Sequence, residues 1–241
     1  MIYEFIKDVI KLVLIALMMF FLLRRYIRHT RPHLAESVEK HRLNILLVLG
    51  ILLVGIKVSE DAITGDSGPA DKAILLFVHT HLPNGFTGFF QAITLTGSFK
   101  VLGSLLVISS VVFLACKRRF EVWLQVCSMV AGALVIYTLK NLTERQRPEL
   151  WETRWYWGTS FPSGHTLGTA CFAMSLALGL SRVWPEQAIL IRLLGLFWVL
   201  LVGCSRLVLG VHWPTDVLAA ACIGLLLPVS IQFLLRFRFK V

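Results

Sequence analysis

Long apolar runs separated by short polar segments make up most of the chain. A helix needs roughly 20 residues to cross the hydrocarbon core of a bilayer, and this length divides the sequence into about seven predicted spans. We expect the spans at residues 8–23, 43–59, 100–116, 121–139, 165–180, 189–204 and 216–235. The pattern predicts an all-α fold, a polytopic transmembrane helix bundle with six core helices and one extra N-terminal helix.

The first apolar run is the weakest of the seven. Residues 12–23 form a short apolar stretch that continues directly into Arg24 and Arg25, without the small-residue cleavage site of a signal peptide. An uncleaved anchor fits this pattern better. We therefore expect residues 1–42 to form an N-terminal membrane anchor with a basic cytoplasmic loop.

Positive charges lie in alternate loops. They cluster between the first and second predicted spans, between the third and fourth, between the fifth and sixth, and after the last. With seven spans all these clusters fall on one side, which the positive-inside rule makes cytoplasmic. The opposite side carries acidic residues in its first loop, namely Glu60, Asp61, Asp66 and Asp71. Dropping the first span leaves the later orientation unchanged.

Composition supports a membrane protein and narrows its partners. Hydrophobic residues make up 56% of the chain and charged residues 16%, whereas soluble domains are about a quarter charged. A net charge of +10 would suggest nucleic acid in a soluble protein. Here cytoplasmic loops account for that charge, so we expect membrane lipids as partners and no nucleic acid. The sequence indicates no particular protein partner.

Two loop regions leave alternatives open. The stretch 72–90 is either a short amphipathic helix lying in the membrane plane or an ordinary re-entering loop. The loop 141–160 carries an aromatic cluster, which is either an interfacial aromatic belt or a wall that grips a lipid tail. The cluster comprises Trp151, Trp155, Tyr156 and Trp157. Arg145 and Arg154 in the same loop are interpreted as solvated charges.

Three cations stand at predicted helix ends, where charge near a membrane is costly and usually functional. They are Lys140, Arg147 and Arg206. Arginine offers a forked donor that fits phosphate oxygens. Lys140 alone could be a snorkelling side chain. Three cations from three helix ends favour a site for a phosphate group.

The segment Ser163-Gly164-His165 opens the fifth predicted span. Serine is a good N-cap, glycine permits close backbone approach, and the free N–H groups of a helix start can bind an anion. A simple capped helix is the alternative. The histidine just inside the cap shifts the interpretation toward a site in which Ser163 and Gly164 hold phosphate oxygens.

The segment from His212 to Asp216 completes the set. Pro214 fits a first helical turn, which places His212 just before a helix and Asp216 within its start. The carboxylate can then accept a hydrogen bond from one ring nitrogen, and the other nitrogen becomes a nucleophile. We expect His212 to attack phosphorus and form a phosphohistidine, and His165 to protonate the leaving oxygen and then activate water.

A metal centre is the competing interpretation, because two histidines and an aspartate resemble a facial triad. Three nearby cations would repel a divalent ion and attract phosphate. The five cysteines add no metal-ligand or disulfide spacing; they are Cys116, Cys127, Cys171, Cys204 and Cys222. We therefore expect no cofactor, no metal and activity without added metal.

These three segments resemble the signature of the type-2 phosphatidic acid phosphatase family, within the superfamily that also holds the vanadium haloperoxidases. Lys140 to Arg147-Pro148 is similar to the first motif, Pro162 to His165 to the second, and Arg206 to Asp216 to the third. The resemblance implies a histidine nucleophile, a histidine acid/base, no metal requirement and a lipid phosphate substrate. Residues 43–241 would then be the six-helix lipid phosphatase domain.

The resemblance leaves the substrate open. Bacterial members of the family act on undecaprenyl diphosphate, phosphatidylglycerophosphate, phosphatidate or lipid A phosphates. Undecaprenyl diphosphate is the leading expectation, because recycling that carrier needs an outward-facing diphosphatase. The site would face the periplasm or exterior of an inner (plasma) membrane. A lipid phosphotransferase with the same intermediate is the main alternative. A transporter is less favoured, because it would tend to show repeated halves or broken midplane helices.

Overall fold

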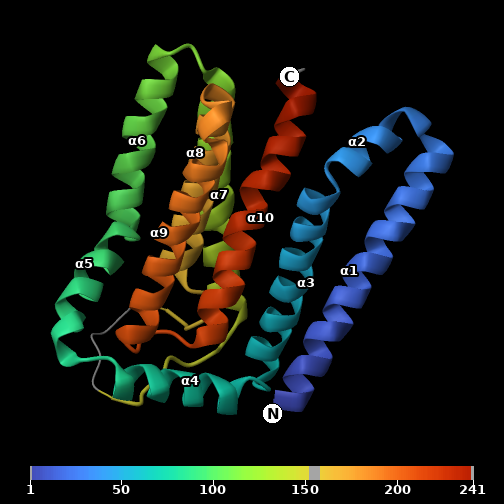
Figure 1. The fold of residues 1–241 in the computed structure, drawn as a ribbon. Helices are drawn as coiled ribbons and strands as arrows, with labels where there is room; N and C mark the ends of the chain where they lie inside the picture. Colours follow the sequence, from blue (N-terminus) through green and yellow to red (C-terminus); the bar gives the residue numbers. More distant parts are fainter. Residues whose placement is uncertain (1, 152–157, 240–241) are drawn as a thin grey trace. The chain divides into compact units, whose positions relative to one another are not determined.

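The computed structural model describes residues 2–151 and 158–239, and every regular element in these ranges is helical (Figure 1). The all-α prediction is confirmed. Seven helices coincide with the seven predicted spans: α1 (Ile2–Thr30), α3 (Arg42–Thr64), α6 (Phe99–Ala115), α7 (Arg119–Leu142), α8 (Gly164–Val183), α9 (Ala188–Val208) and α10 (Pro214–Phe239). Of the expected aromatic cluster, Trp155, Tyr156 and Trp157 lie outside the described residues, as does Arg154.

Within the described residues, five helices are long and apolar enough to cross a membrane, namely α3, α7, α8, α9 and α10. A sixth span forms if α6 is joined to α5 (Thr87–Thr96), which meets it at a bend of 47°. The extra helix α1 does not meet this criterion, because charged residues flank its apolar run on both sides. The protein is a multi-pass membrane helix bundle.

The chain divides into two compact units, residues 1–57 and residues 58–241. The first unit contains α1, η1 (Pro32–Leu34), α2 (Ala35–Lys40) and most of α3. An apolar groove of about 270 Å³ lies between α1 and α3 and is lined by Leu12, Ala16 and Gly50 among others. Among the described side chains of this unit, Ala16 is the one buried hydrophobic side chain. Most of the unit's apolar surface is therefore exposed.

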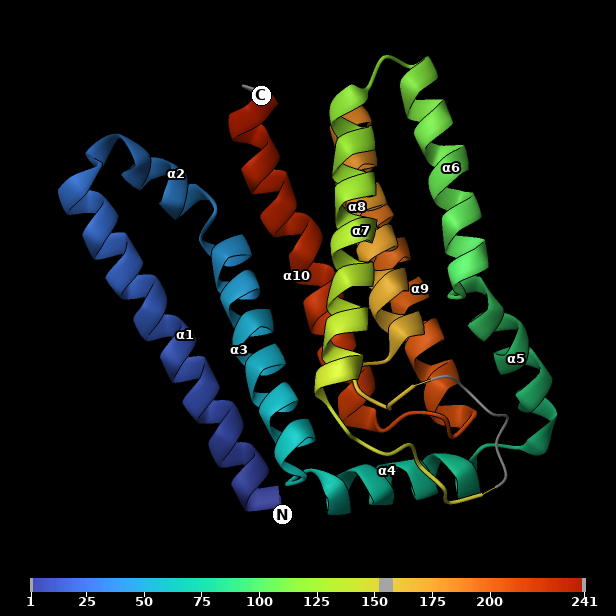
Figure 2. The ribbon, with the colours of Figure 1, turned by 180° about the vertical axis from the view of Figure 1, so that it is seen from behind.

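The second unit is built around α8, which packs against α7, α9 and α10 (Figure 2). Small residues allow this close approach. A Cβ added at Gly224 of α10 would lie 2.6 Å from Cβ of Ala170 and 2.7 Å from the carbonyl oxygen of Leu167, both on α8. Small residues at helix interfaces are the common way to pack helices in lipid, where apolar burial alone gives little driving force. The result is a largely buried α8.

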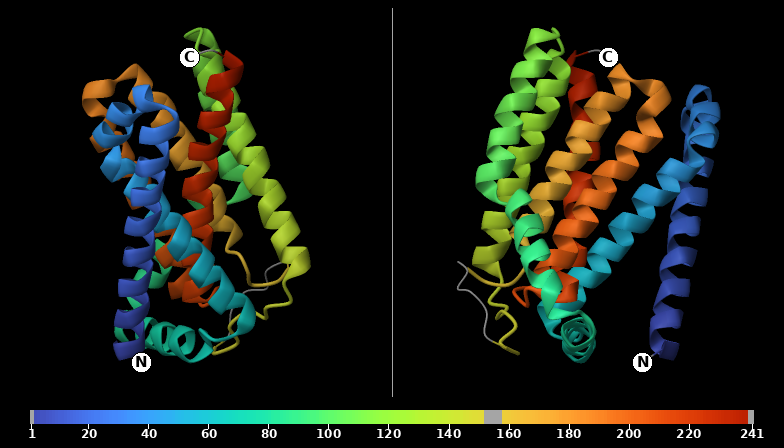
Figure 3. Two further views of the ribbon diagram at one scale, coloured as in Figure 1. Left: turned by 90° about the vertical axis from the view of Figure 1, so that its right-hand side faces the viewer. Right: turned by 60° about the vertical axis from the view of Figure 1, so that its left-hand side comes forward.

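The connection from α3 to α6 crosses one end of this bundle. Helix α4 (Gly68–His81) runs across the long helices and packs against α9 and α10 (Figure 3). The helical alternative for the start of the stretch 72–90 is thus correct. After η2 (Asn84–Phe86), α5 leads to Gly97, where an added Cβ would lie 2.7 Å from Val202 of α9. Ser98 then caps α6 by accepting the N–H of Val101 at 3.4 Å.

Candidate active site

Five of the side chains proposed from sequence line one cavity of about 490 Å³. They come from the end of α7, the α7–α8 loop, the start of α8, the end of α9 and the α9–α10 loop: Lys140, Arg147, His165, Arg206 and His212. Gly164 lines the same cavity. Residues that are up to 72 positions apart in the sequence are therefore brought together at one end of the bundle.

The rest of the cavity wall is apolar. It is formed by α6, α7 and α8, and includes Leu102, Gly103, Leu106, Gly132, Ala133 and Ile136. Several of these residues are glycine or alanine, so the helix backbones leave room for a ligand between them. The cavity therefore joins a polar, cationic end to an apolar region within the helix bundle, a combination suited to an amphiphile with an anionic head.

Backbone carbonyl groups of the surrounding loops hold two of the cations. Lys140 Nζ donates to the carbonyl oxygen of Thr159, and the Thr159 hydroxyl donates back to the Lys140 carbonyl at 2.9 Å. Arg147 Nε donates to the carbonyl oxygen of Gly158 at 3.1 Å and its Nη1 to that of Val211 at 2.8 Å. These bonds leave both side chains charged, because a carbonyl neutralises no charge.

Arg206 is the third cation, and only 1% of its surface is exposed. Its Nη1 donates to the hydroxyl of Thr94 on α5 at 2.6 Å. Because a guanidinium does not deprotonate in proteins, Arg206 brings a positive charge to the cavity that it lines. The bend region of α5 thus contributes to the site, a role that the sequence pattern did not indicate.

His212 is buried between Arg147 and Asp216. Its Nε2 lies 3.4 Å from Nη1 of Arg147, and its Nδ1 lies 3.6 Å from Oδ2 of Asp216. The second distance is too long for the hydrogen bond expected from sequence, and the two groups form an ion pair only when the imidazole is protonated. Burial lowers the pKa of His212 from 6.5 to about 4, although Asp216 acts in the opposite direction. The imidazole is therefore neutral at physiological pH.

The start of α8 differs in one respect from the expectation. Ser163 occupies the N-cap position, but its side chain makes no capping bond to the backbone. Instead its hydroxyl pairs with that of Thr166 at 3.0 Å, and its N–H donates to the carbonyl oxygen of Asp216 at 3.3 Å. Ser163 is fully buried, while Gly164 and His165 line the cavity. The helix start is thus tied to the start of α10.

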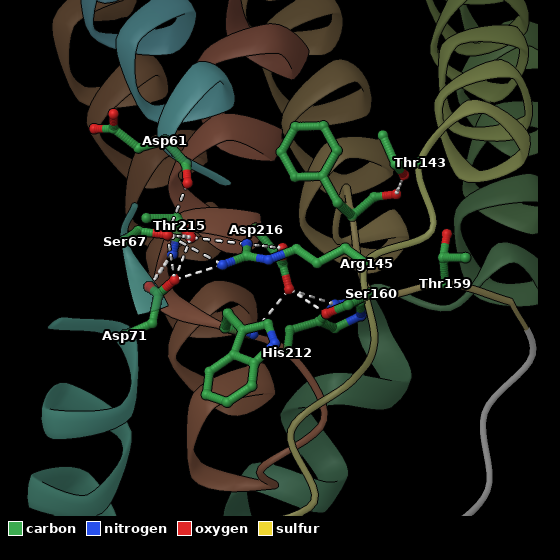
Figure 4. Close-up of polar contacts among 12 residues, drawn as sticks. Asp61, Ser67, Asp71, Thr143, Arg145, Thr159, Ser160, His212, Thr215 and Asp216 are labelled. Atoms are coloured by element: carbon green, nitrogen blue, oxygen red, sulfur yellow. Dashed lines mark hydrogen bonds and ion pairs between the residues drawn. The ribbon is translucent and has the colours of Figure 1, made fainter. Parts of the chain in front are cut away.

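Arg145 is not a solvated loop charge, and that prediction was wrong. Its Nη1 lies 2.5 Å from Oδ1 of Asp216 and its Nη2 lies 2.6 Å from Oδ2 of Asp71, so it bridges two buried carboxylates (Figure 4). Its side chain is 13% exposed. The prediction failed because Asp71 lies 74 positions earlier in the chain, too far for any local spacing to reveal it as a partner of Arg145.

Both carboxylate oxygens of Asp216 have hydrogen-bond partners. Besides Arg145, the hydroxyl of Ser160 donates to its Oδ2, and the backbone N–H of Trp213 donates to the same oxygen at 2.9 Å. Among the described residues there is no group of three or more His, Cys, Asp or Glu side chains arranged to hold a metal ion. The residues around the cavity are suited to a phosphate rather than to a cation.

Comparison with known proteins identifies a family and several relatives of this chain. The model of the PAP2 superfamily matches residues 121–238, nearly all of α7 to α10. Phosphatidylglycerophosphatase B of Bacillus subtilis is 28% identical over 186 residues, covering 76% of this chain and 90% of that protein. An undecaprenyl-diphosphatase of Sulfolobus acidocaldarius is 40% identical over 65 residues, covering 27% of this chain and 28% of its own length.

A solved structure gives the same result for the fold. The crystal structure of a transmembrane PAP2-type phosphatidylglycerolphosphate phosphatase from Bacillus subtilis matches with a TM-score of 0.72 and 26% sequence identity. The match covers 80% of this chain and 96% of that one. With the family match over residues 121–238, the chain is a member of the PAP2 superfamily, a membrane lipid phosphatase of the type-2 phosphatidic acid phosphatase family.

Proposed function

We propose that this protein hydrolyses a lipid phosphomonoester or diphosphate through a phosphohistidine formed on His212. The observation that carries the proposal is the single cavity in which two histidines and three cations adjoin an apolar wall. A phosphate group fits the cationic end, and the hydrocarbon part of the same molecule fits the apolar region between α6, α7 and α8.

His212 is the nucleophile and His165 the acid and base. Because His212 is neutral, a ring nitrogen can attack phosphorus in line while the bond from phosphorus to the leaving oxygen breaks. His165 donates a proton to that oxygen, which leaves as the lipid alcohol or lipid phosphate. His165, now neutral, takes a proton from water, which attacks the phosphohistidine, releases inorganic phosphate and restores His212.

The other proposed site residues stabilise the phosphate group or orient His212. Lys140, Arg147 and Arg206 neutralise the phosphate oxygens. The unpaired N–H groups at the start of α8, beginning with Gly164, assist at the same oxygens. Ser163 holds that helix start in place through its bonds to Thr166 and to the carbonyl oxygen of Asp216. Asp216 orients His212 and stabilises it when its ring becomes positive.

The proposed orientation places the site at the periplasmic or outer face of an inner (plasma) membrane. Within residues 58–241, the α6–α7 connection with Lys117, Arg118 and Arg119 lies at the end of the bundle opposite α4 (Figure 1). Basic loops are retained in the cytoplasm, which leaves the site on the other side. We also propose residues 43–241 as the phosphatase domain and residues 1–42 as its anchor and basic loop.

Two substrates are the strongest candidates. The relative whose alignment covers 90% of its length is a phosphatidylglycerophosphatase B, which favours phosphatidylglycerophosphate. Undecaprenyl diphosphate remains the substrate expected from the need for an outward-facing diphosphatase, and the shorter match to an undecaprenyl-diphosphatase favours it as well. Both molecules join a terminal phosphate, through a polar head, to long hydrocarbon chains, a combination that suits the cationic and apolar ends of the cavity.

The decisive experiment measures phosphate release from each lipid in detergent with excess EDTA, for wild type and His212→Ala. Release by wild type alone supports a metal-independent phosphatase that depends on His212. Release that disappears with EDTA, or full activity of His212→Ala, refutes the mechanism. Labelled donor lipid and product analysis distinguish hydrolysis from transfer to an acceptor lipid, because transfer yields no free phosphate.

A further inference from the structure

A buried charge network lies on the side of Asp216 away from the cavity. Arg145 bridges Asp71 of α4 and Asp216 of α10 with one nitrogen to each (Figure 4). The two carboxylate side chains are 1% and 0% exposed. A carboxylate buried to this degree is costly unless it is paired and hydrogen-bonded. Arg145 is the one cation that the described residues place against both.

Asp71 is fixed independently of Arg145. Its Oδ1 accepts the backbone N–H of Thr215 at 3.0 Å, and its Oδ2 accepts the hydroxyl of Thr215 at 2.7 Å and that of Ser67 at 2.8 Å. Thr215 lies in the first turn of α10, so Asp71 caps that helix from α4 and stabilises its start. The residue beside Thr215 is Asp216.

These contacts fix the orientation of the Asp216 carboxylate. Arg145 holds Oδ1, while Ser160 and the N–H of Trp213 hold Oδ2, the oxygen that lies 3.6 Å from Nδ1 of His212. Without Arg145, Oδ1 would lose its strongest partner and the carboxylate could rotate away from the imidazole. The effect would pass to His212, although Arg145 is not among the residues that line the cavity.

We propose that Arg145 and Asp71 are positioning residues for the phosphoryl-transfer step: Asp71 holds Arg145, Arg145 orients Asp216, and Asp216 aligns His212 for attack. The inference rests on the proposed phosphatase function. It predicts that these residues govern the rate of phosphohistidine formation and leave phosphate binding unchanged, because the phosphate contacts come from other side chains.

A structural ion pair in the same bundle provides the control. Arg182 Nε lies 3.2 Å from Oε1 of Glu121, whose side chain is 3% exposed, and this pair joins α8 to α7 without lining the cavity. Like the Arg145 pairs, it links two elements through a buried carboxylate. The double variant Glu121→Gln/Arg182→Gln should therefore lower thermal stability and leave the rate of phosphohistidine formation within about twofold of wild type.

The test uses single-turnover labelling of the full-length protein in detergent with a ³²P-labelled lipid phosphate, together with the Kd for inorganic phosphate. Arg145→Gln should slow labelling about 100-fold, the size of effect that a displacement of about 1 Å in a catalytic group can cause. The Kd for phosphate should stay within twofold. In an Asp216→Asn background, Arg145→Gln should add less than threefold, because its effect passes through Asp216.

A second pair of variants guards against misfolding. Asp71→Asn/Arg145→Gln removes one negative and one positive charge together, so the net charge of the three groups is unchanged; it should slow labelling as Arg145→Gln does. Arg145→Lys should restore part of the rate. Wild-type labelling rates in these variants, or an undiminished effect of Arg145→Gln without Asp216, would overturn the inference alone. Failure of wild type itself to become labelled would overturn the proposed function and the inference with it.

Discussion

Helices α3 and α8 are both candidate membrane spans, but they use their residues in opposite ways. Of the residues in the most apolar stretch of α3, 6% are buried within the protein, whereas 61% are buried in that of α8, although α8 is the less apolar of the two. In a membrane the lipid accepts apolar side chains. The helices that become buried within the protein are therefore those with small and polar residues, which pack closely. The less apolar helix is the one that carries the site.

Substitution of His165 on α8 should have the largest effect in this comparison. His165→Gln removes the proton donor and the base, so turnover should fall about 10²–10⁴-fold. With p-nitrophenyl phosphate, whose leaving group needs no proton, the phosphohistidine should still form and then accumulate. Rapid-quench labelling measures both steps. Rapid turnover of the labelled intermediate in this variant would exclude His165 as the base.

The pH dependence of stability provides the next largest effect. His212 has a folded pKa of about 4 and an unfolded value of about 6.5. Between these values the unfolded state binds more protons, so the free energy of unfolding decreases as pH falls through this window, by up to about 3 kcal/mol. The melting temperature of wild type should therefore fall more steeply from pH 7 to pH 4.5 than that of His212→Asn. A shallower fall in wild type would contradict the buried, neutral histidine.

Glycine substitutions compare the packing around α8 with that of α3. An added Cβ at Gly224 would meet Ala170 and the backbone of Leu167, whereas one at Gly50 meets no atom within 4 Å. Gly224→Ala should cost roughly 1–3 kcal/mol of stability through overpacking. Gly50→Ala should stabilise by about 0.5–1 kcal/mol, because alanine restricts the unfolded chain. Thermal denaturation in one detergent measures the change in stability of both variants. A change of the same sign in both would contradict the difference in packing.

The two apolar cavities should differ in their effect on activity. Gly103 lines the cavity that contains the histidines, Gly50 lines the groove between α1 and α3, and a Cβ at either position meets no atom within 4 Å. Gly103→Leu should raise KM for a long-chain lipid phosphate about tenfold, a typical change for methylene groups in an apolar pocket. Its KM for p-nitrophenyl phosphate should not change. Gly50→Leu is the matched control and should leave both values unchanged.

The sequence was sufficient to predict the seven helices α1, α3 and α6 to α10, and to place five of the proposed site residues at neighbouring helix ends. Each segment stands at the polar end of an apolar run, and the ends of consecutive spans on one side of a membrane must lie at the same depth. This rule places Lys140, His165 and His212 on one side of the membrane, and the packing of α8 against α7 and α10 then brings them together. The depth of a helix end depends on the apolar run alone and not on side-chain packing, so the sequence is enough to predict it.

What the sequence could not provide are contacts set by packing. Arg145 and Asp71 are brought together by α4, whose course across the bundle depends on where α9 ends and α10 begins. The joining of Thr94 to Arg206 depends on the bend between α5 and α6. The separation of His212 from Asp216 is also decided by neighbours, since Ser160 and Trp213 occupy the oxygen that was expected to bond the imidazole.

The apolar wall of the cavity has a kinetic consequence. Because α6, α7 and α8 provide that wall, a lipid can keep its hydrocarbon chain among other hydrocarbon chains while its headgroup reaches the histidines. The quantity that governs the rate is then the number of substrate molecules per area of bilayer rather than per volume of solution. At a fixed bulk concentration of substrate, diluting it with an inert lipid or detergent should slow turnover in proportion to its surface fraction.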